Sequence, residues 1–222
     1  MVLHDFWTFF IWSTVAGLAV IGIYQLFLLI LRARGVFVTR TKFGLTMIFD
    51  SEDADGTPIR LLNVNGTFQS VSYIAPELRF ELCVHYHRMM AKVIQQVSAR
   101  GHVVVMGGGG FSLPKHLATH MSGGVIDAIE IDPKIVSLAR EHFFLDEAQA
   151  AASSELRVIE DDAWKVLQDA EAGSIDVLVN EVFAGRKSLG PLGTAAGAQV
   201  VKEKLAFGGV YLADVRCPLE GR

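Results

Sequence analysis

VVVMGGGG, at residues 103–110, joins a short apolar run to four consecutive glycines. An uninterrupted apolar run of this length is typical of a strand buried on both faces of a parallel sheet. Glycines directly after such a strand allow the backbone to turn sharply and to approach a ligand closely, although a tight strand-to-helix turn alone would need them too. Because Leu113 stands where the fingerprint G-x-G-x-x-G has its third glycine, a small adenosyl ligand is favoured over a nicotinamide dinucleotide.

The chain after this motif alternates apolar runs with helical patterns, which predicts an α/β fold with a doubly wound parallel sheet. The further strands are expected at 125–131, 156–159, 175–179 and 209–215, and the helices at about 113–121, 133–144, 163–169 and 195–205. An internal repeat or a low-complexity linker is not evident.

Carboxylates follow the second and third expected strands. Glu130 lies 20 residues beyond Gly110 and is placed to accept hydrogen bonds from ribose hydroxyls. Asp162, followed by Ala163, is placed to accept a hydrogen bond from an adenine amino group, and Asp161 is the competing candidate. Because the carboxyl ends of parallel strands share one edge of a sheet, we expect these residues and the glycines to meet there. A solvated strand end is the alternative for each acid.

The N-terminal segment 6–31 contains 26 residues without Asp, Glu, Lys or Arg. As a helix it would be ~39 Å long, which exceeds the ~30 Å hydrocarbon core of a bilayer. Four basic residues follow it, Arg32, Arg34, Arg40 and Lys42. The positive-inside rule therefore predicts a single-pass membrane protein with the rest of the chain in the cytoplasm. A buried or interfacial helix is the alternative, and a signal peptide fits less well because a basic n-region and a cleavage site are not evident.

The region between this segment and the glycine motif predicts a small antiparallel meander of three strands over 43–73. Asn65-Gly66 is a strong two-residue hairpin signal. Apolar residues at helical spacing then predict a helix over 77–98. We therefore expect three parts, namely a transmembrane anchor (1–35), a β-hairpin domain (36–75) and a nucleotide-type α/β domain (76–222).

Composition excludes several classes of protein. The chain of 222 residues is 51% apolar with a mean hydropathy of +0.36 and a net charge of −4. A slightly acidic chain without a basic face argues against a nucleic-acid binder. Two cysteines, Cys83 and Cys217, are too few for a disulfide scaffold and indicate reduced thiols in a cytosolic domain.

Several motifs, in order and at consistent spacing, resemble the spermidine synthase family of polyamine biosynthesis. The family's core is the class I fold of methyltransferases that use S-adenosylmethionine. The resemblance covers about 43–215 and is closest to a divergent, membrane-associated branch. The stretches that carry it are LLNVNGTFQSVSY, VVVMGGGG, DAIEIDPKIVSLAREHF, VIEDDAWKVL, SIDVLVNEVFAG and KEKLAFGGVYLADV.

The resemblance implies transfer of an aminopropyl group from decarboxylated S-adenosylmethionine to a diamine, without a metal. Glu181 falls where the family has its proton-accepting aspartate, and Glu130 would bind the ribose of the donor. Tyr86 and His87 would bind the acceptor. The remaining positions that match the donor site are Gly107, Gly108, Gly109, Gln69, Asp162 and Ala163.

The sequence also departs from the family's pattern. Gly110 replaces the acid after three glycines, Arg88 replaces the acid after the Tyr-His pair, and Ala184 replaces the second acid of an Asp-x-x-Asp motif. Each lost charge-assisted contact costs roughly 1.5–3 kcal/mol, so putrescine is a poor candidate for the acceptor. Three hypotheses follow: an aminopropyltransferase-like enzyme with another small-molecule acceptor, a methyltransferase using S-adenosylmethionine, or a non-catalytic, membrane-anchored binder of adenosyl ligands.

Two further features bear on partners and metals. Only Arg216–Arg222 follow the fifth expected strand, where the methyltransferase fold normally has more strands. We therefore expect a second copy or a partner to cover this edge, or else a truncated product. His116 and His120 have a metal-binding spacing, but a third ligand is not evident, so a structural or solvated pair is the preferred interpretation.

Overall fold

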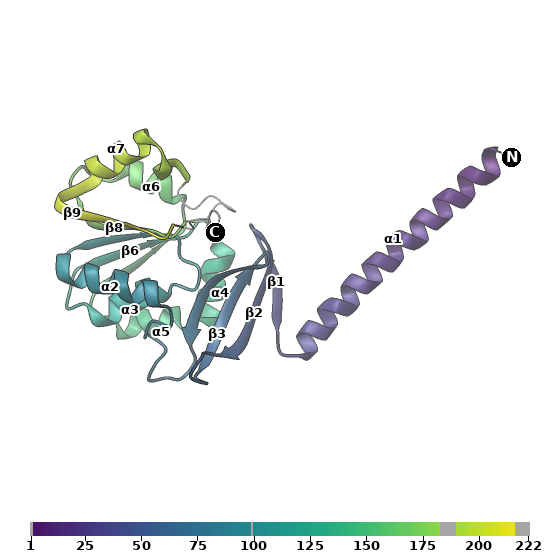
Figure 1. Cartoon of the computed structure of the whole chain (residues 1–222), viewed down its shortest axis with the longest axis horizontal. Coiled ribbons are helices and arrows are strands. Elements are labelled where there is room, and N and C mark those ends of the chain that lie inside the picture. The colour runs from purple at the N-terminus through teal and green to yellow at the C-terminus, as the bar shows by residue number, and fades with distance from the viewer. Residues whose placement is uncertain (1, 99, 183–189, 216–222) are drawn as a thin grey trace, which may run out of the picture.

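The computed structural model describes residues 2–98, 100–182 and 190–215. Figure 1 shows a long N-terminal helix, a sheet that follows it, and a larger α/β body. Ala184 and Cys217, which entered the sequence argument, lie outside the described residues.

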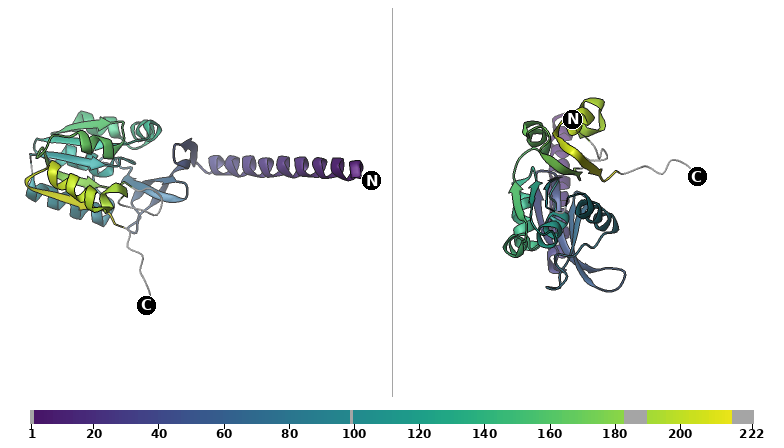
Figure 2. Two further views of the ribbon diagram at one scale, coloured as in Figure 1. Left: turned by 90° about the horizontal axis from the view of Figure 1, so that it is seen from above. Right: turned by 90° about the vertical axis from the view of Figure 1, so that its left-hand side faces the viewer.

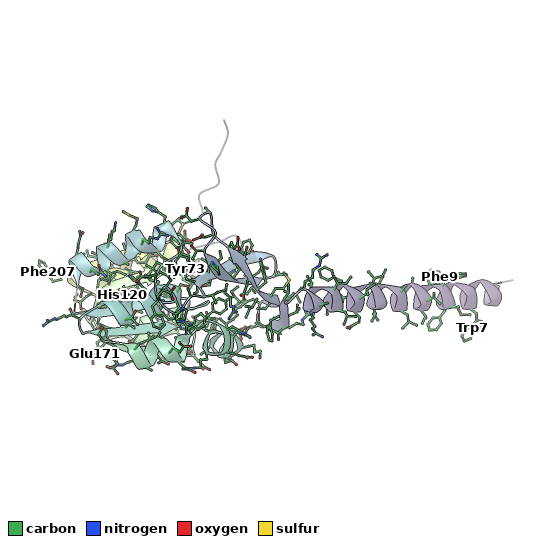
Figure 3. All side chains as sticks on the ribbon, turned by 90° about the horizontal axis from the view of Figure 1, so that it is seen from below. Trp7, Phe9, Tyr73, His120, Glu171 and Phe207 are labelled. Carbon is green, nitrogen blue, oxygen red and sulfur yellow. The ribbon has the colours of Figure 1, made fainter. Side chains whose placement is uncertain are left out.

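Helix α1 (Val2–Ala33) extends away from the rest of the chain, as Figure 1 and the left view of Figure 2 show. Its stretch Phe9–Ala33 has a mean hydropathy of 2.3, and none of it is buried. Trp7 and Phe9 project from the helix into open space (Figure 3). The segment is thus long and apolar enough to cross a membrane, although signal sequences near an N-terminus share these features.

An antiparallel sheet follows, with the order β1-β2-β3-β4. Its strands are β1 (Phe37–Thr41), β2 (Gly44–Glu52), β3 (Pro58–Val64) and β4 (Thr67–Tyr73). The hairpin at Asn65-Gly66 is present, and both residues have positive φ, as a type I′ turn requires. The prediction of three strands missed β1, because its pattern FVTRT carries Arg40 and was assigned to the basic stretch after the membrane segment.

Helix α2 (His85–Val97) begins eight residues later than the predicted helix, which started at residue 77. The residues before it form turns in which Leu82 is buried in the core. The Arg88 guanidinium donates to the carbonyl oxygens of Leu82 (2.8 Å) and Cys83 (2.7 Å), so these carbonyls are paired outside a helix. Cys83 is a free thiol, and burial raises its pKa to about 11.

The body contains a parallel sheet of five strands in the order β7-β6-β5-β8-β9. The predicted doubly wound sheet is therefore confirmed, with the first strand in the middle. The strands are β5 (His102–Met106), β6 (Val125–Ile129), β7 (Glu155–Ile159), β8 (Ile175–Asn180) and β9 (Leu205–Ala213).

Helices cover both faces of this sheet. Alternate residues of β5 explain this, since Val103 and Val105 pack with α2 and α3 (Ser112–His120). Val104 and Met106 pack with α6 (Ala163–Asp169) and α7 (Ala195–Lys204) on the other face. Figure 1 shows these two pairs of helices on opposite sides of the strands. The helices are α3 (Ser112–His120), α4 (Pro133–His142), α5 (Leu145–Ala151), α6 (Ala163–Asp169) and α7 (Ala195–Lys204), with a 3₁₀ turn η1 (Gly190–Gly193).

A separate apolar cluster joins the antiparallel sheet to the body. Ile48, Leu62 and Val64 from the sheet pack with Leu138 and Phe143, which lie in and directly after α4. This packing brings the middle of β4, at Gln69 and Ser70, against the glycine motif that follows β5. The sheet therefore forms one wall of the region described next.

Candidate functional site

The glycine loop after β5 contacts the backbone of the residue that follows β8. Gly107 has φ +99°, and a Cβ at this position would lie 2.9 Å from the Glu181 carbonyl oxygen. The Glu181 amide donates to the Met106 carbonyl oxygen at 2.9 Å. Both the conformation and the close approach require glycine, so the loop places Glu181 at the carboxyl edge of the sheet.

Glu130 binds the next two residues of the loop. Its Oε2 accepts hydrogen bonds from the amides of Gly108 (3.0 Å) and Gly109 (3.2 Å), and its Oε1 accepts one from the Asp132 amide (3.0 Å). The residue is only 8% exposed. A carboxylate has about four acceptor positions, so these three bonds fix its orientation and leave room for a ligand hydroxyl.

Gln69 lies at a β-bulge of β4. In the pairing with β3, Leu62 is opposite Ser70 and Asn63 is opposite Phe68, so Gln69 is the extra residue. A Cβ at Gly109, where φ is +51°, would lie 3.3 Å from the Gln69 carbonyl oxygen. Bulges redirect a side chain and are frequent beside functional sites. The antiparallel sheet thus contributes an exposed amide next to the loop.

His87 and Glu181 link α2 to the carboxyl edge of the parallel sheet. His87 Nε2 lies 2.5 Å from Glu181 Oε1, and the two side chains are 9% and 13% exposed. The ring of Tyr86 lies 4.3 Å from the His87 ring, centroid to centroid, and Tyr86 is more exposed. The structure therefore brings together a carboxylate, an imidazole and an aromatic ring from two distant segments.

Asp162 and Ala163 lie one strand further out, after β7. Asp162 is the N-cap of α6 and accepts a hydrogen bond from the Trp164 amide at 2.8 Å, while Ala163 is buried. Asp161 pairs with Lys165 at 2.8 Å, which holds the pKa of Asp161 below its usual value. Asp161 is thus engaged in a local ion pair, whereas Asp162 remains exposed at the edge.

The structure gives a physical reason for the missing acid at Gly110. A Cβ there would lie 2.6 Å from Ser70 Oγ and 3.1 Å from the Phe143 ring, so the space for a side chain is already filled. Ser70 Oγ and Ser112 Oγ are hydrogen-bonded at 3.0 Å. Ser112 also bonds Ser72 and the Val71 carbonyl oxygen, so a hydroxyl cluster stands beside the position of the lost carboxylate.

Lys115 completes this cluster and was missed by sequence reasoning. It is 1% exposed and donates to Ser72 Oγ at 3.2 Å and to the Phe143 carbonyl oxygen. Burial lowers its pKa to about 7. Lysine at an α3 position looks like a solvated residue in the sequence, and only the packing of the antiparallel sheet on the body buries it.

Arg88, which replaces the family's acid after the Tyr-His pair, is bonded to backbone carbonyls before α2. Its guanidinium is bonded to the Leu82 and Cys83 carbonyl oxygens, whereas the neighbouring His87 bonds Glu181. Adjacent residues on a helix project about 100° apart, which separates the two side chains.

The family model of the spermine/spermidine synthase domain matches residues 83–221, which is more than half of the chain. The chain belongs to this family. The match begins just before α2 and includes the glycine loop, Glu130 and Glu181, whereas Gln69 lies before it.

Individual relatives agree with this assignment. A polyamine aminopropyltransferase of Thioalkalivibrio sulfidiphilus is 28% identical over 113 residues, which are 50% of this chain and 38% of the relative. A probable spermidine synthase from Corynebacterium glutamicum superposes with a TM-score of 0.63 at 23% identity, covering 79% of this chain and 62% of that one. The chain therefore spans less than two thirds of these relatives.

Two further solved structures carry adenosyl-type ligands. A spermidine synthase in complex with the transition-state analogue AdoDATO has a TM-score of 0.59 at 17% identity, covering 79% of this chain and 56% of that one. Human methyltransferase-like protein 13 in complex with SAH has a TM-score of 0.52 at 24% identity, covering 61% and 66%. These likenesses show the shared fold.

Proposed function

We propose that this chain is a spermidine synthase-like transferase that uses an adenosyl-sulfonium donor and an acceptor other than putrescine. One observation carries the proposal: the glycine loop contacts Glu181 through Gly107 and Glu130 through the next two amides. A donor lying across this loop would have its ribose at Glu130 and its sulfonium end toward Glu181. Proteins of the same fold solved with AdoDATO and SAH support an adenosyl-type ligand for this chain.

The chemistry needs a base near the reacting carbon. An amine nitrogen attacks the carbon bonded to the sulfonium sulfur, the carbon–sulfur electrons pass to sulfur, and a neutral thioether leaves. The amine proton goes to a carboxylate, and Glu181 is our candidate because it is oriented by His87. Gln69, Tyr86 and His87 would border the pocket, and Asp162 with Ala163 would contact the adenine. These roles stay predictions.

The altered acceptor is supported by the surroundings of Gly110. A dicationic diamine needs carboxylates, yet Ser70 Oγ occupies the space of one of them. Hydroxyls bind a cationic chain more weakly than carboxylates do, since they provide no charge. We therefore infer a monoamine or a less cationic acceptor.

The glycine at position 110, with the Ser70 hydroxyl beside it, also favours methyl transfer as the second candidate. The carboxylate of S-adenosylmethionine would be repelled by an acid at position 110, and glycine with neighbouring hydroxyls removes this repulsion. Donor choice therefore separates the two enzyme hypotheses. A non-catalytic binder is the third outcome of the same test.

The test is calorimetric titration of the full chain in detergent with three ligands: S-adenosylmethionine, its decarboxylated form and methylthioadenosine. Tighter binding of the decarboxylated donor supports aminopropyl transfer, whereas preference for the carboxylated donor supports methyl transfer. Binding without turnover in an acceptor screen supports the non-catalytic hypothesis. If the folded chain bound none of the three ligands, the result would contradict the adenosyl site.

For location, we propose that α1 anchors the chain as a single transmembrane helix with the body in the cytoplasm. The support is the exposed apolar surface of Phe9–Ala33 and the basic residues that follow it. The division into 1–35, 36–75 and 76–222 and a homo-oligomer covering β9 stay predictions. Protease protection in sealed inverted vesicles tests the topology, because a cytoplasmic body is digested there and a translocated one is protected.

A further inference from the structure

A cluster of two histidines and a glutamate lies outside the site described above. His116 and His120 stand one turn apart on α3, and their rings stack with centroids 4.1 Å apart. Glu81 comes from the turn before α2, and its Oε1 lies 3.0 Å from His120 Nε2. One potential ligand atom from each of the three residues lies within 4.8 Å of the other two. The fold thus supplies Glu81 as the third potential ligand, which the sequence around His116 and His120 does not show.

The hydrogen bonds of the two rings show which nitrogens are free to bind a cation. His116 Nδ1 lies 2.9 Å from the Phe80 carbonyl oxygen, and His120 Nδ1 lies 2.9 Å from the His116 carbonyl oxygen. A carbonyl oxygen only accepts, so the neutral His116 ring carries its proton on Nδ1 and its lone pair on Nε2. His120 Nδ1 also lies 2.9 Å from the Thr119 hydroxyl, so the His120 ring can carry its proton on either nitrogen. Metal-ligating histidines characteristically donate their other nitrogen to a carbonyl in this way.

The space between His120 and Glu81 suits a bound cation. With Nδ1 protonated, the neutral His120 ring presents a lone pair at Nε2 toward a carboxylate oxygen 3.0 Å away. Two acceptors at this distance repel each other unless a proton or a metal ion lies between them. One metal ion can contact all three residues, because a potential ligand atom of each lies within 4.8 Å of the other two, and the His116 ring lies beside the same carboxylate, with Nδ1 4.0 Å from Glu81 Oε2.

The cluster lies in the wall of a cleft of about 570 Å³. His116 is mostly buried, with 12% of its side chain exposed, whereas Glu81 and His120 are 46% and 35% exposed. The two exposed side chains have room to move the short distance to metal-bonding length, about 2.0–2.2 Å for nitrogen and oxygen. Three protein ligands beside a cleft leave a coordination position open to water or to a small anion.

We propose that Glu81, His116 and His120 bind a divalent transition-metal ion of the zinc class. Two imidazoles and one carboxylate are a ligand set that such ions favour over Mg²⁺ or Ca²⁺, which prefer oxygen ligands. Bound metal ties the turn before α2 to α3 and thereby stabilises the start of the helix that carries His87. The inference is independent of the reaction proposed above.

The experiment uses the full chain in detergent, purified with a tag that lacks histidine and stripped with EDTA. Titration with ZnCl₂ is followed by calorimetry, and metal content is measured by atomic absorption. We expect one zinc ion per chain and a zinc-dependent rise in the unfolding temperature. His120→Ala and Glu81→Gln change exposed side chains, so they leave the fold intact and weaken zinc binding by at least about tenfold.

His142→Ala is the matched control, since His142 lies on α4 and packs against Phe37 instead. It leaves zinc affinity unchanged. Equal zinc affinity in the wild-type chain and in His120→Ala would overturn the proposal. A folded, EDTA-stripped chain that binds no stoichiometric zinc would also overturn the proposal. The contact between Glu81 and His120 would then be an ion pair only.

Discussion

His87 Nε2 and Glu181 Oε1 lie 2.5 Å apart, although the two residues are separated by 94 positions in the sequence. An ionised carboxylate only accepts, so Nε2 is the donor, and the buried Nδ1 has no hydrogen-bond partner among the described residues. The bond fixes one oxygen of Glu181 and leaves the other available to a ligand. It joins α2 to the carboxyl end of β8, and four predictions concern this region of the molecule.

Glu181→Gln removes the candidate proton acceptor while keeping nearly the same shape. We expect turnover with any accepted amine to fall by at least about 100-fold, because general-base catalysis contributes roughly 10²–10⁴-fold. Donor affinity should change little. Rates are compared with those of Glu171→Gln, an exposed acid before β8 that should behave as wild type. Full activity of Glu181→Gln would exclude Glu181 as the base.

Glu130→Gln changes the acceptor that holds the glycine loop. The amide keeps one acceptor oxygen but loses the charge that binds the Gly108, Gly109 and Asp132 amides. A charge-assisted hydrogen bond contributes roughly 1.5–3 kcal/mol, so the affinity for methylthioadenosine should fall by about tenfold or more. Calorimetry measures this change. Unaltered affinity would show that the ligand does not bind at this carboxylate.

Gly110→Ala tests the space that Ser70 occupies. The new methyl group would lie 2.6 Å from Ser70 Oγ, so we expect the free energy of unfolding to fall by about 1–3 kcal/mol, as for other overpacked sites. Ser70→Gly in the same chain removes the clash and should restore part of the loss. Urea unfolding of the two variants and the wild type measures both effects, and additive losses would contradict the steric explanation.

Lys115→Met tests the buried amine. The pKa of Lys115 is lowered to about 7 in the fold, against about 10.4 in an unfolded chain. Between these values the unfolded chain binds a proton that the folded chain lacks, so the free energy of unfolding rises with pH by about 1.4 kcal/mol per unit. Below pH 7 both states are protonated, and this contribution no longer changes.

The comparison for Lys115 is a pair of pH profiles. Unfolding temperatures of wild type and Lys115→Met are measured from pH 6 to pH 9.5. We expect the wild type to gain stability relative to the variant above pH 7, and the two curves to run parallel below it. Parallel curves over the whole range would mean that Lys115 stays charged in the fold.

Local patterns were sufficient for most of the α/β body. The α6 prediction, 163–169, agrees with the structure. The predicted α3 is shifted by one residue at both ends, and the predicted α7 begins correctly and ends one residue too late. The helix expected at 133–144 ends at His142, and α5 follows after Phe144, whose φ is +61°. Such a left-handed residue between two apolar stretches leaves no clear signal in the pattern.

The candidate site was predictable in its positions but not in its contacts. Strand ends place Gly107, Glu130 and Glu181 at one edge, because parallel strands share their direction. The bulge at Gln69 and the partner of Glu181 depend on pairings between distant segments. Neither β-register nor a contact across 94 residues has a local pattern in a single sequence.

The sequence by itself determined the apolar helix, the parallel α/β order and the family, since each depends on periodicity or on short motifs. Only the tertiary structure determined that Ser70 fills the space beside Gly110, that Lys115 is buried and that Glu81 joins His116 and His120. These features arise where the antiparallel sheet and the turn before α2 pack on α3. Packing between distant segments creates the burial and charge proximity that change side-chain chemistry, whereas local sequence determines only which residues are available for it.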